Sequence, residues 1–378
     1  MKSALHNCLV VFGATVFALL LVELGSWVWV ETVRGQQLSR WEFRATQPPP
    51  YQDADYFSQR FLGESETFVN GRLNDLVELN DYRGEYFNVS NGFRVTTDKP
   101  EGYTRRILLF GGSTLFGQEV PDRHTIASYL QRTLNDSGRA WKVLNYGLPG
   151  MNARQQVSIL KKIPLRATDI IIFYHGVNDI YYVVFGGAPG GWTSGVPNFR
   201  PIQELNALAQ WMSRWHDRLK GYSFTADVAL DIFDRSVPET IANPDKLIEG
   251  AELAVVQFRA AVSEAYAHVA RSDAEFVHFL QPTIFDVRER SEYEARLLTH
   301  YLETPPGVDI AFREGYPMLR DASFALSTDG IAFRDITDAL DQRHAYGEIF
   351  LDFCHLNHTG NSLIADRIFE DYFKFRID

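Results

Sequence analysis

The chain carries the side chains that a serine-dependent acyl transfer needs. Ser113 follows two glycines and a short apolar stretch, residues 105–110. Far downstream, Asp352 and His355 stand three residues apart. A serine hydroxyl is a poor nucleophile until a neighbouring base accepts its proton, and a carboxylate can hold that base in the required tautomer. We therefore predict that Ser113 is a nucleophile, that His355 is its general base and that Asp352 orients the imidazole.

Two shorter motifs between these residues offer donors for the oxyanion of a tetrahedral intermediate. Residues 145–147 close one apolar stretch with Gly147, and residues 176–179 close another and contain Asn178. We expect three donors, namely the backbone N–H groups of Ser113 and Gly147 and the side-chain amide of Asn178. Glycine permits a close approach of the backbone to a substrate. Removal of one such donor typically lowers the rate on the order of 100–1000-fold.

These four segments resemble the SGNH (GDSL-like) hydrolase superfamily, whose four blocks carry Ser, Gly, Asn and His in this order. The resemblance covers roughly residues 104–378. The first block has Gly112 where the family more often has aspartate, a form shared by related membrane-anchored bacterial members. The resemblance implies a flavodoxin-like α/β/α three-layer fold and the hydrolysis of esters, often acetyl esters on carbohydrates. The residues that match the four blocks are Ser113, Gly147, Asn178 and the pair Asp352 and His355.

Each motif also has a simpler explanation. The glycines before Ser113 could form a phosphate-binding turn, although no lysine follows them as in a phosphate-binding loop. Asn178 and Asp179 could cap a helix. His358 is a rival base, but His355 is the one that follows a carboxylate by three residues. The four motifs together, in this order, favour the acyl-transfer interpretation.

Several other chemistries lack their motifs. Ser113 does not lie in a Gly-x-Ser-x-Gly elbow, which disfavours an α/β-hydrolase. The chain has no His-Glu-x-x-His sequence and no cluster of Cys and His, so we expect no metal and no cofactor. Thr114, Asp179 and His175 lie beside the predicted site, and we expect them to have structural roles.

Length and composition predict one large folded domain with an appendage. The chain has 378 residues, of which 45% are hydrophobic, so it can build a sizeable core. The formal net charge of −11 argues against a nucleic-acid partner, which would call for a basic face. Cys8 lies in the apolar N-terminal segment and Cys354 beside the predicted base, so we do not expect these two cysteines to pair.

Residues 8–30 form an apolar segment that we expect to span a membrane. At 1.5 Å per residue they would extend about 34 Å, and a bilayer core is about 30 Å thick. Glu23 would cost on the order of 3 kcal/mol at the centre of a span, but it lies off-centre and ten Leu, Val or Phe residues between positions 9 and 22 offset it. No Ala-x-Ala cleavage site follows, so we predict an uncleaved signal anchor with residues 1–7 in the cytoplasm. The protein would then cross the inner (cytoplasmic) membrane once, with its catalytic domain periplasmic or extracellular.

The remaining sequence divides into a lead-in and a catalytic domain. We expect residues 31–103 to form a juxtamembrane linker, through residue 60, and then a small β-rich lead-in with a hairpin at Asn91-Gly92. Residues 104–378 alternate strand and helix patterns, and the early motifs fall at the carboxyl ends of strands, where α/β sheets bind ligands. A glycine-rich stretch at 185–200, within an insertion at about 180–240, is a candidate lid. The expected strands are 105–110, 142–145, 169–174, 275–280 and 331–335, and the expected helices are 124–136, 152–162, 244–271 and 358–373.

These observations predict a membrane-anchored serine esterase that acts on small acyl groups. We expect acetyl as the acyl group and a cell-envelope or secreted polysaccharide as the alcohol. Two alternatives stay open. The same site could pass the acyl group to a sugar hydroxyl, as in a polysaccharide O-acyltransferase. The chain could instead be a non-enzymatic glycan-binding or assembly factor with an inactive site.

Overall fold

The computed structural model describes two compact units of the chain. They are residues Met1–Arg44 with Thr193–Thr240, and residues Ala45–Trp192 with Ile241–Asp378. The described residues are 15, 17–25, 47, 49–66, 69–73, 76–185, 243–303, 307–341 and 343–376. Residues 186–200 of the candidate lid therefore lie outside the described residues, as does most of the predicted anchor.

In the first unit, residues 17–25 are helical and carry apolar side chains that face solvent. Within the described part of the chain, no helix is both long enough and apolar enough to cross a membrane. The side chains in this helix that are more than half exposed are Phe17, Leu19, Leu20, Leu21, Val22 and Leu24.

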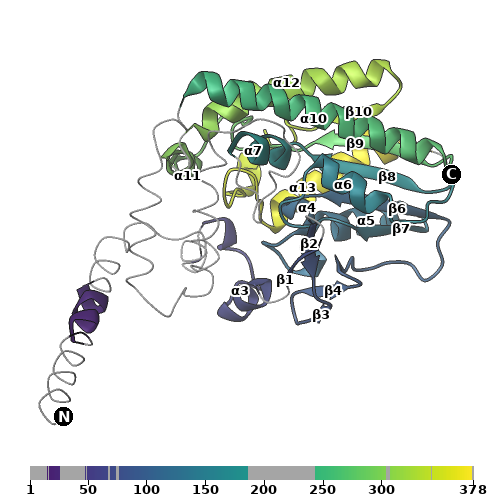
Figure 1. Ribbon diagram of the computed structural model, residues 1–378. Helices are drawn as coiled ribbons and strands as arrows, with labels where there is room; N and C mark the ends of the chain where they lie inside the picture. Colours follow the sequence, from purple (N-terminus) through teal and green to yellow (C-terminus); the bar gives the residue numbers. More distant parts are fainter. Residues whose placement is uncertain are drawn as a thin grey trace, which may run out of the picture. The chain divides into compact units, whose positions relative to one another are not determined.

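The second unit is built on a five-stranded, wholly parallel sheet with the order β10-β9-β8-β6-β7 (Figure 1). In its register, Leu109 of β6 lies between Asn145 of β7 and Ile172 of β8. Every residue of β8 is buried, because helices cover both faces of a parallel sheet. The strands are β6 (Arg105–Gly111), β7 (Trp141–Asn145), β8 (Ile170–His175), β9 (Glu275–Leu280) and β10 (Ala332–Asp335).

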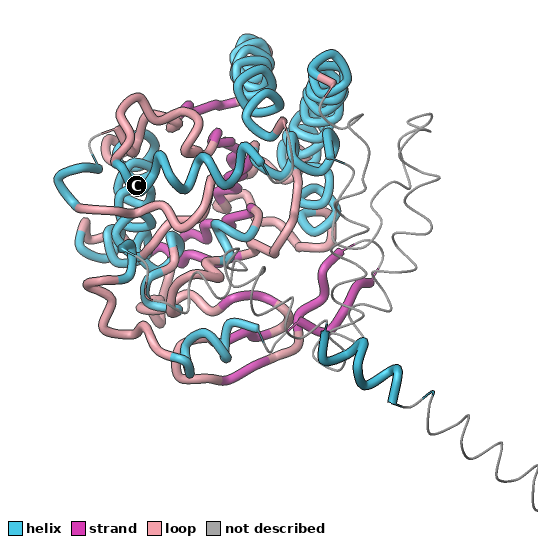
Figure 2. The backbone as a smooth tube through the Cα atoms, turned by 90° about the vertical axis from the view of Figure 1, so that its left-hand side faces the viewer, coloured by secondary structure: helices cyan, strands magenta, loops and turns pink. Residues whose placement is uncertain are grey.

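The helices form two groups, one on each face of this sheet (Figures 1 and 2). The first group is α4 (Ser113–Phe116), α5 (Ile126–Asp136), α13 (His358–Ile368) and the π-helical turn η6 (Phe369–Phe373). The second is α6 (Ala153–Leu160), α7 (Val177–Phe185), α10 (Pro244–Ala270) and α12 (Val308–Thr328), with α11 (Glu292–Glu303) packed against α12. The result is a three-layer α/β/α domain, as predicted.

The strand order is that of the flavodoxin-like doubly wound sheets. From β6 the chain passes first to β7 on one side and then to β8 on the other, so the order reverses between β6 and β8. Such a reversal leaves a crevice at the carboxyl ends of the two strands, where ligands bind. Residues Ser113 and Asn178 follow these two strands directly.

From here on we call residues 49–103 the lead-in, because the folded part begins earlier than expected. Part of the linker prediction is therefore wrong. A linker was expected through residue 60, but η2 (Pro49–Tyr51) and α3 (Gln59–Glu66) pack into the domain. Tyr51 and Phe61 are almost wholly buried, and their rings meet edge to face with centroids 6.3 Å apart. Burial of these aromatic side chains outweighs the extended preference of the preceding prolines.

The rest of the lead-in forms two small antiparallel sheets. β4 (Asn88–Ser90) and β5 (Phe93–Arg94) form the hairpin expected at Asn91-Gly92. Both turn residues have positive φ, at 54° and 75°, as a tight two-residue hairpin of this kind requires. The other strands are β1 (Val69–Leu73), β2 (Leu76–Leu79) and β3 (Tyr82–Arg83).

Candidate active site

The nucleophile lies at the turn between β6 and α4. A side chain on Gly111 would place its Cβ 2.7 Å from the carbonyl oxygen of Tyr174 in the neighbouring strand, so this turn requires glycine. Ser113 is the first residue of α4 and is half-buried. The first N–H groups of a helix have no acceptor within the helix. The Ser113 N–H therefore stands at the same edge of the domain as the hydroxyl.

The base lies on a short hairpin, residues 350–356, which we call the base hairpin. A bridge between Phe350 and Leu356 closes it, and the Leu351 N–H donates to the His355 carbonyl at 2.9 Å. Inside the turn, Asp352 Oδ1 accepts the backbone N–H groups of Cys354 at 3.0 Å and His355 at 2.7 Å. The orienting carboxylate thus also shapes the turn that presents the base.

The structure brings together the three residues predicted to transfer the proton. His355 Nε2 lies 2.7 Å from Ser113 Oγ, and His355 Nδ1 lies 2.8 and 2.7 Å from the two oxygens of Asp352. An ionised carboxylate can only accept hydrogen bonds, so the proton of a neutral imidazole belongs on Nδ1. Nε2 then accepts a hydrogen bond from the Ser113 hydroxyl. We call this hydrogen-bonded chain the relay.

Burial separates the inner end of the relay from its reactive end. Asp352 and His355 are 2% and 5% exposed, whereas Ser113 and Asn178 are half-buried. The rival base His358 contacts the lead-in instead, with its Nδ1 3.3 Å from the Tyr56 hydroxyl. The position of His355 in the structure thus agrees with the choice made from the sequence.

The expected oxyanion donor Gly147 requires a correction. Its N–H donates to Asn145 Oδ1 at 2.9 Å, and the Asn145 amide is fixed in turn by donating to the Leu115 carbonyl at 2.9 Å. Gly147 is buried, and a Cβ there would lie 2.7 Å from the Phe116 nitrogen. The glycine is required for close packing against α4, and its N–H already has an acceptor.

Gly150, three residues further on, has a backbone N–H that is available as a hydrogen-bond donor. Within the part of the chain that the structure describes, the N–H groups of Tyr146, Leu148 and Met151 all have acceptors, and that of Gly150 has none. Gly150 is half-buried and has a φ of 74°. The Met151 N–H donates to the Leu148 carbonyl, so residues 148–151 form a turn. A Pro-Gly pair at its centre is typical of a type II turn, a signal already present in the sequence.

Asn178 joins this turn to the nucleophile. Its Nδ2 donates to the Met151 carbonyl at 3.0 Å, which leaves its second amide hydrogen for a substrate. A Cβ on Gly112 would lie 2.3 Å from the same nitrogen. Glycine at position 112 therefore makes room for the Asn178 amide beside Ser113.

Asp179 joins the segment that carries Gly150 to the segment that carries Asn178. Its carboxylate accepts the Ala153 N–H at 2.9 Å and the Gly176 N–H at 3.1 Å, so it ties the start of α6 to the start of α7. Burial raises the pKa of Asp179 to about 6, and these backbone hydrogen bonds oppose the shift. The structural role expected for Asp179 is therefore a specific one, because it holds the two segments that carry Gly150 and Asn178.

His175 belongs to a buried histidine pair under the site. Its Nε2 lies 3.2 Å from His278 Nδ1, and the outer nitrogen of each ring has no hydrogen-bond partner among the described residues. Burial lowers the pKa of His278 to about 3 and holds that of His175 well below its usual value. Both imidazoles are neutral packing groups, and neither contacts the relay.

The structure gives no separate place for a metal ion among the described residues. The one group of three potential ligands with atoms within 4.8 Å of each other is Asp352, Cys354 and His355. Two of these residues are members of the relay, and His355 Nδ1 is already bonded to Asp352. The group therefore serves proton transfer, and we assign no metal site to it.

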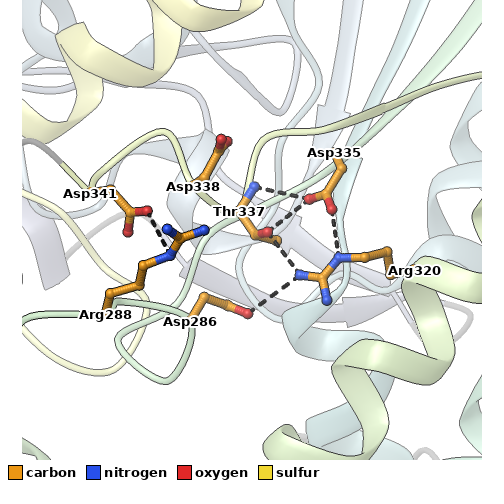
Figure 3. Close-up of a pocket in the computed structure, with 7 residues that line it drawn as sticks. All are labelled: Asp286, Arg288, Arg320, Asp335, Thr337, Asp338 and Asp341. Carbon is orange, nitrogen blue, oxygen red and sulfur yellow. Dashed lines mark hydrogen bonds and ion pairs between the residues drawn. The ribbon is translucent and has the colours of Figure 1, made fainter.

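A polar hollow of about 430 Å³ lies at the end of β10 (Figure 3). Arg320 bonds Asp335 at 2.5 Å and Thr337 at 2.8 Å, and lies 3.8 Å from Asp286. Burial raises the pKa of Asp286 to about 6. These charges pair with one another across the hollow, so we regard it as an ion-pair network that fixes the loop after β9 to the sheet edge. It is lined by Asp286, Arg288, Arg320, Asp335, Thr337, Asp338 and Asp341.

A scan against protein-family models finds no match, and a search of curated proteins finds none either. Among solved structures, the chain is similar to a member of the lipolytic protein G-D-S-L family from Veillonella parvula, at 14% identity over 72% of this chain and 100% of that one, with a TM-score of 0.40. It is similar to an acetyl xylan esterase at 12% identity, 71% and 100% coverage and a TM-score of 0.38. A catalytic mutant of an acetylxylan esterase from Geobacillus stearothermophilus gives 10% identity, 71% and 94% coverage and a TM-score of 0.36. At these values the similarity carries no argument about function, which is inferred below from the site.

Proposed function

We propose that this protein is an SGNH-type serine esterase that removes small acyl groups, with acetyl as the expected one, from a cell-envelope or secreted polysaccharide. The observation that carries the proposal is the relay, with 2.7 Å between Ser113 Oγ and His355 Nε2 and 2.7 Å between His355 Nδ1 and Asp352 Oδ2. These distances are those of hydrogen bonds ready for proton transfer.

The relay supplies the first half of the reaction. Ser113 Oγ attacks the ester carbonyl carbon while His355 Nε2 takes the hydroxyl proton. The resulting imidazolium carries its positive charge beside Asp352, which stabilises it at two oxygens. His355 then returns the proton to the departing alcohol oxygen as the tetrahedral intermediate collapses. The acyl group remains on Ser113 as an ester.

The oxyanion side stabilises the negative charge that develops on the carbonyl oxygen. We assign its donors to the Ser113 N–H, the Gly150 N–H and the second amide hydrogen of Asn178. Donors fixed in advance stabilise a transition state without reorganisation, which makes each of them valuable. Water then attacks the acyl carbon while His355 Nε2 takes its proton, and the same donors stabilise the second oxyanion. The bond between the acyl carbon and Ser113 Oγ breaks, and His355 returns the proton to Oγ as the acid leaves.

The polysaccharide part of the proposal rests on the motif resemblance, and the membrane location rests on residues 8–30. The exposed apolar side chains of residues 17–25 support the anchor, because six of them face solvent around a single helix: Phe17, Leu19, Leu20, Leu21, Val22 and Leu24. Large apolar side chains exposed together mark a surface that is covered by a membrane or another protein.

The proposal is tested with the detergent-solubilised full-length protein and a series of chromogenic esters from acetyl to octanoyl. We expect acetyl to react fastest, Ser113→Ala to be inactive, and a fluorophosphonate reagent to label Ser113. An acetylated oligosaccharide should release acetate. Acetylation of an added sugar acceptor in preference to acetate release would identify an acyltransferase. No turnover and no labelling of Ser113 would favour the non-enzymatic alternative.

A separate measurement tests the anchor. The full-length protein should stay with the membrane fraction after alkaline extraction, and an added protease should digest the catalytic domain from the periplasmic side only. A soluble mature form that begins near residue 31 would contradict the anchor without affecting the esterase proposal.

A further inference from the structure

The lead-in reaches the loop that follows the nucleophile helix α4. The Tyr51 hydroxyl donates to the Glu119 carbonyl at 2.9 Å. Arg94 donates to the carbonyls of Gly117 at 3.0 Å and Val120 at 2.9 Å. These three carbonyls lie just beyond the helix that begins with Ser113, so the lead-in braces this side of the relay.

The Arg94 contact is a rigid one. The side chain is fully buried, pairs with Asp122 Oδ1 at 2.5 Å and lies over the Phe87 ring at 4.1 Å. A buried guanidinium is stable only when its donors are satisfied, and here carbonyl and carboxylate oxygens satisfy them. The lead-in and the loop after α4 therefore hold a fixed position relative to each other.

The lead-in also reaches the base hairpin, through Asn357. This residue lies two positions after His355 and is 4% exposed. Its Nδ2 donates to the Pro50 carbonyl in the lead-in at 2.7 Å and to the Glu348 carbonyl at 3.2 Å. Its backbone N–H donates to the Ile349 carbonyl at 2.9 Å, at the open end of the base hairpin.

Asn357 has a second role that shows why an amide is needed here. Its Oδ1 accepts the Gly360 N–H at 3.0 Å and so caps the start of α13. Serine, threonine or aspartate would serve equally well as that cap. Only an amide can cap the helix with its oxygen and also donate two hydrogen bonds with its nitrogen. The contact with Pro50 thus accounts for the residue type.

We propose that Asn357 is a positioning residue, which holds His355 toward Ser113 by joining the base hairpin to the lead-in. This inference rests on the proposed esterase function. Because the same lead-in braces the loop after α4, it fixes both partners of the hydrogen bond between Ser113 and His355. Pro50 and Tyr51, which lie in the stretch expected to be linker, therefore help to position the catalytic groups.

The test replaces the amide and keeps the helix cap. In the full-length protein, Asn357→Ser and Asn357→Asp retain an oxygen for the cap and lose the donors to Pro50 and Glu348. Misplacement of a catalytic group by about 1 Å can cost about 100-fold. We therefore expect kcat for the acetyl ester to fall about 10- to 100-fold per active site titrated with fluorophosphonate, with KM within about twofold. Asn243→Ser is the matched control, because Asn243 caps α10 away from the relay, and it should leave kcat unchanged.

The outcomes separate this inference from the proposed function. If Asn357→Ser keeps the wild-type kcat per titrated site, Asn357 is only a helix cap and the inference is wrong. The same conclusion follows if only the titratable fraction falls. If the unaltered protein neither turns over nor reacts with the reagent, the esterase proposal itself fails.

A double variant tests the shared brace directly. Tyr51→Phe removes the hydroxyl that reaches Glu119 and keeps the ring. If the lead-in couples both loops, the kcat losses of Tyr51→Phe and Asn357→Ser will not multiply in the double variant. Losses that multiply would mean that the two loops are held independently, and the coupling would be overturned.

Discussion

The relay side and the oxyanion side of the proposed active site are built from different kinds of groups. On the relay side, Ser113, His355 and Asp352 act through side chains of three different chemical kinds. On the oxyanion side, two of the three donors are backbone N–H groups, which are the same in every residue except proline. Gly147 is buried and its N–H already has an acceptor, whereas Gly150 is half-buried.

This difference determines how much activity a substitution on each side removes. The relay is a single series of bonds, so the loss of one member stops proton transfer. The oxyanion donors act in parallel, so the loss of one leaves the others in place. We therefore expect substitutions on the two sides to differ in the size of their effect and in whether their effects combine.

The largest effect is expected from the relay. Ser113→Ala and His355→Ala should each lower kcat by about 10⁴- to 10⁶-fold, and the double variant should be no worse, because nucleophile and base act as a unit. Asp352→Asn should cost about 10⁴-fold, since it can stabilise the wrong imidazole tautomer. The measurement is ester turnover with circular dichroism to confirm folding. The control is His358→Ala, which should change kcat by about twofold or less; the opposite ranking of the two histidines would show that the base is misassigned.

A smaller loss is expected on the oxyanion side. Asn178→Ala should lower kcat by about 10²- to 10³-fold with little change in KM, because the lost donor acts mainly in the transition state. A structure with a bound phosphonate should place its oxyanion about 2.7–3.1 Å from the Gly150 nitrogen. Contact with the Gly147 nitrogen instead would restore the assignment made from the sequence.

Gly112→Ala tests whether the two sides meet as described. Its φ of −82° suits alanine, so the only obstacle is the Asn178 amide, 2.3 Å from the added Cβ. Displacement of that amide should lower kcat by about 10- to 100-fold. Gly102→Ala, where a Cβ meets nothing within 4 Å, is the matched control. Equal activity of the two variants would mean that Asn178 does not need its present position.

The smallest effect concerns the pH dependence of the free energy of unfolding, through the buried pair of His175 and His278. Because burial lowers the folded pKa of His278 to about 3, the unfolded chain takes up a proton below about pH 6.5 that the folded chain does not. The stability of the folded state that depends on a neutral imidazole is fully present above pH 6.5. It is lost as pH falls, by at most about 1.4 kcal/mol per pH unit for each imidazole. Asp179 and Asp286, with pKa values raised from 3.8 to about 6, act in the opposite sense between those values. We expect His278→Phe to remove about one histidine's share of the slope in urea unfolding between pH 7 and 5, and parallel curves for the two proteins would contradict this.

The lead-in shows that composition alone does not predict which residues of a polar stretch are buried. The prolines at positions 48–50 favour an extended start, whereas Pro49–Tyr51 form the short helix η2. The prolines also gave no sign that Tyr51 and Phe61 would be buried. Residues 49–60 were therefore expected to be linker. An aromatic side chain in a polar stretch becomes core only if a surface elsewhere in the chain fits it. Here that surface includes the loop after α4, more than 60 residues away.

The sequence by itself determined the strands of the sheet and the members of the relay. Short continuous apolar stretches such as residues 170–175, in alternation with helix patterns, favour buried strands. The spacing of Asp352 and His355 lets one turn align a carboxylate with an imidazole. The strands and the Asp352–His355 pair depend on neighbours in the chain, whereas the bond from His355 to Ser113 joins residues 242 positions apart.

Only the tertiary structure decided the oxyanion side and the brace around it. Asn145 is two residues before Gly147, and an asparagine often bonds the N–H two residues on, so a local signal was present. That bond becomes fixed because the Asn145 amide also reaches the Leu115 carbonyl, thirty residues away. In the sequence, Asn357 likewise has the features of a simple helix cap. Only the structure shows its hydrogen bond to Pro50, which lies 307 residues earlier. The sequence does not show which hydrogen-bond donors already have an acceptor. That depends on acceptors in distant segments, which only folding brings close.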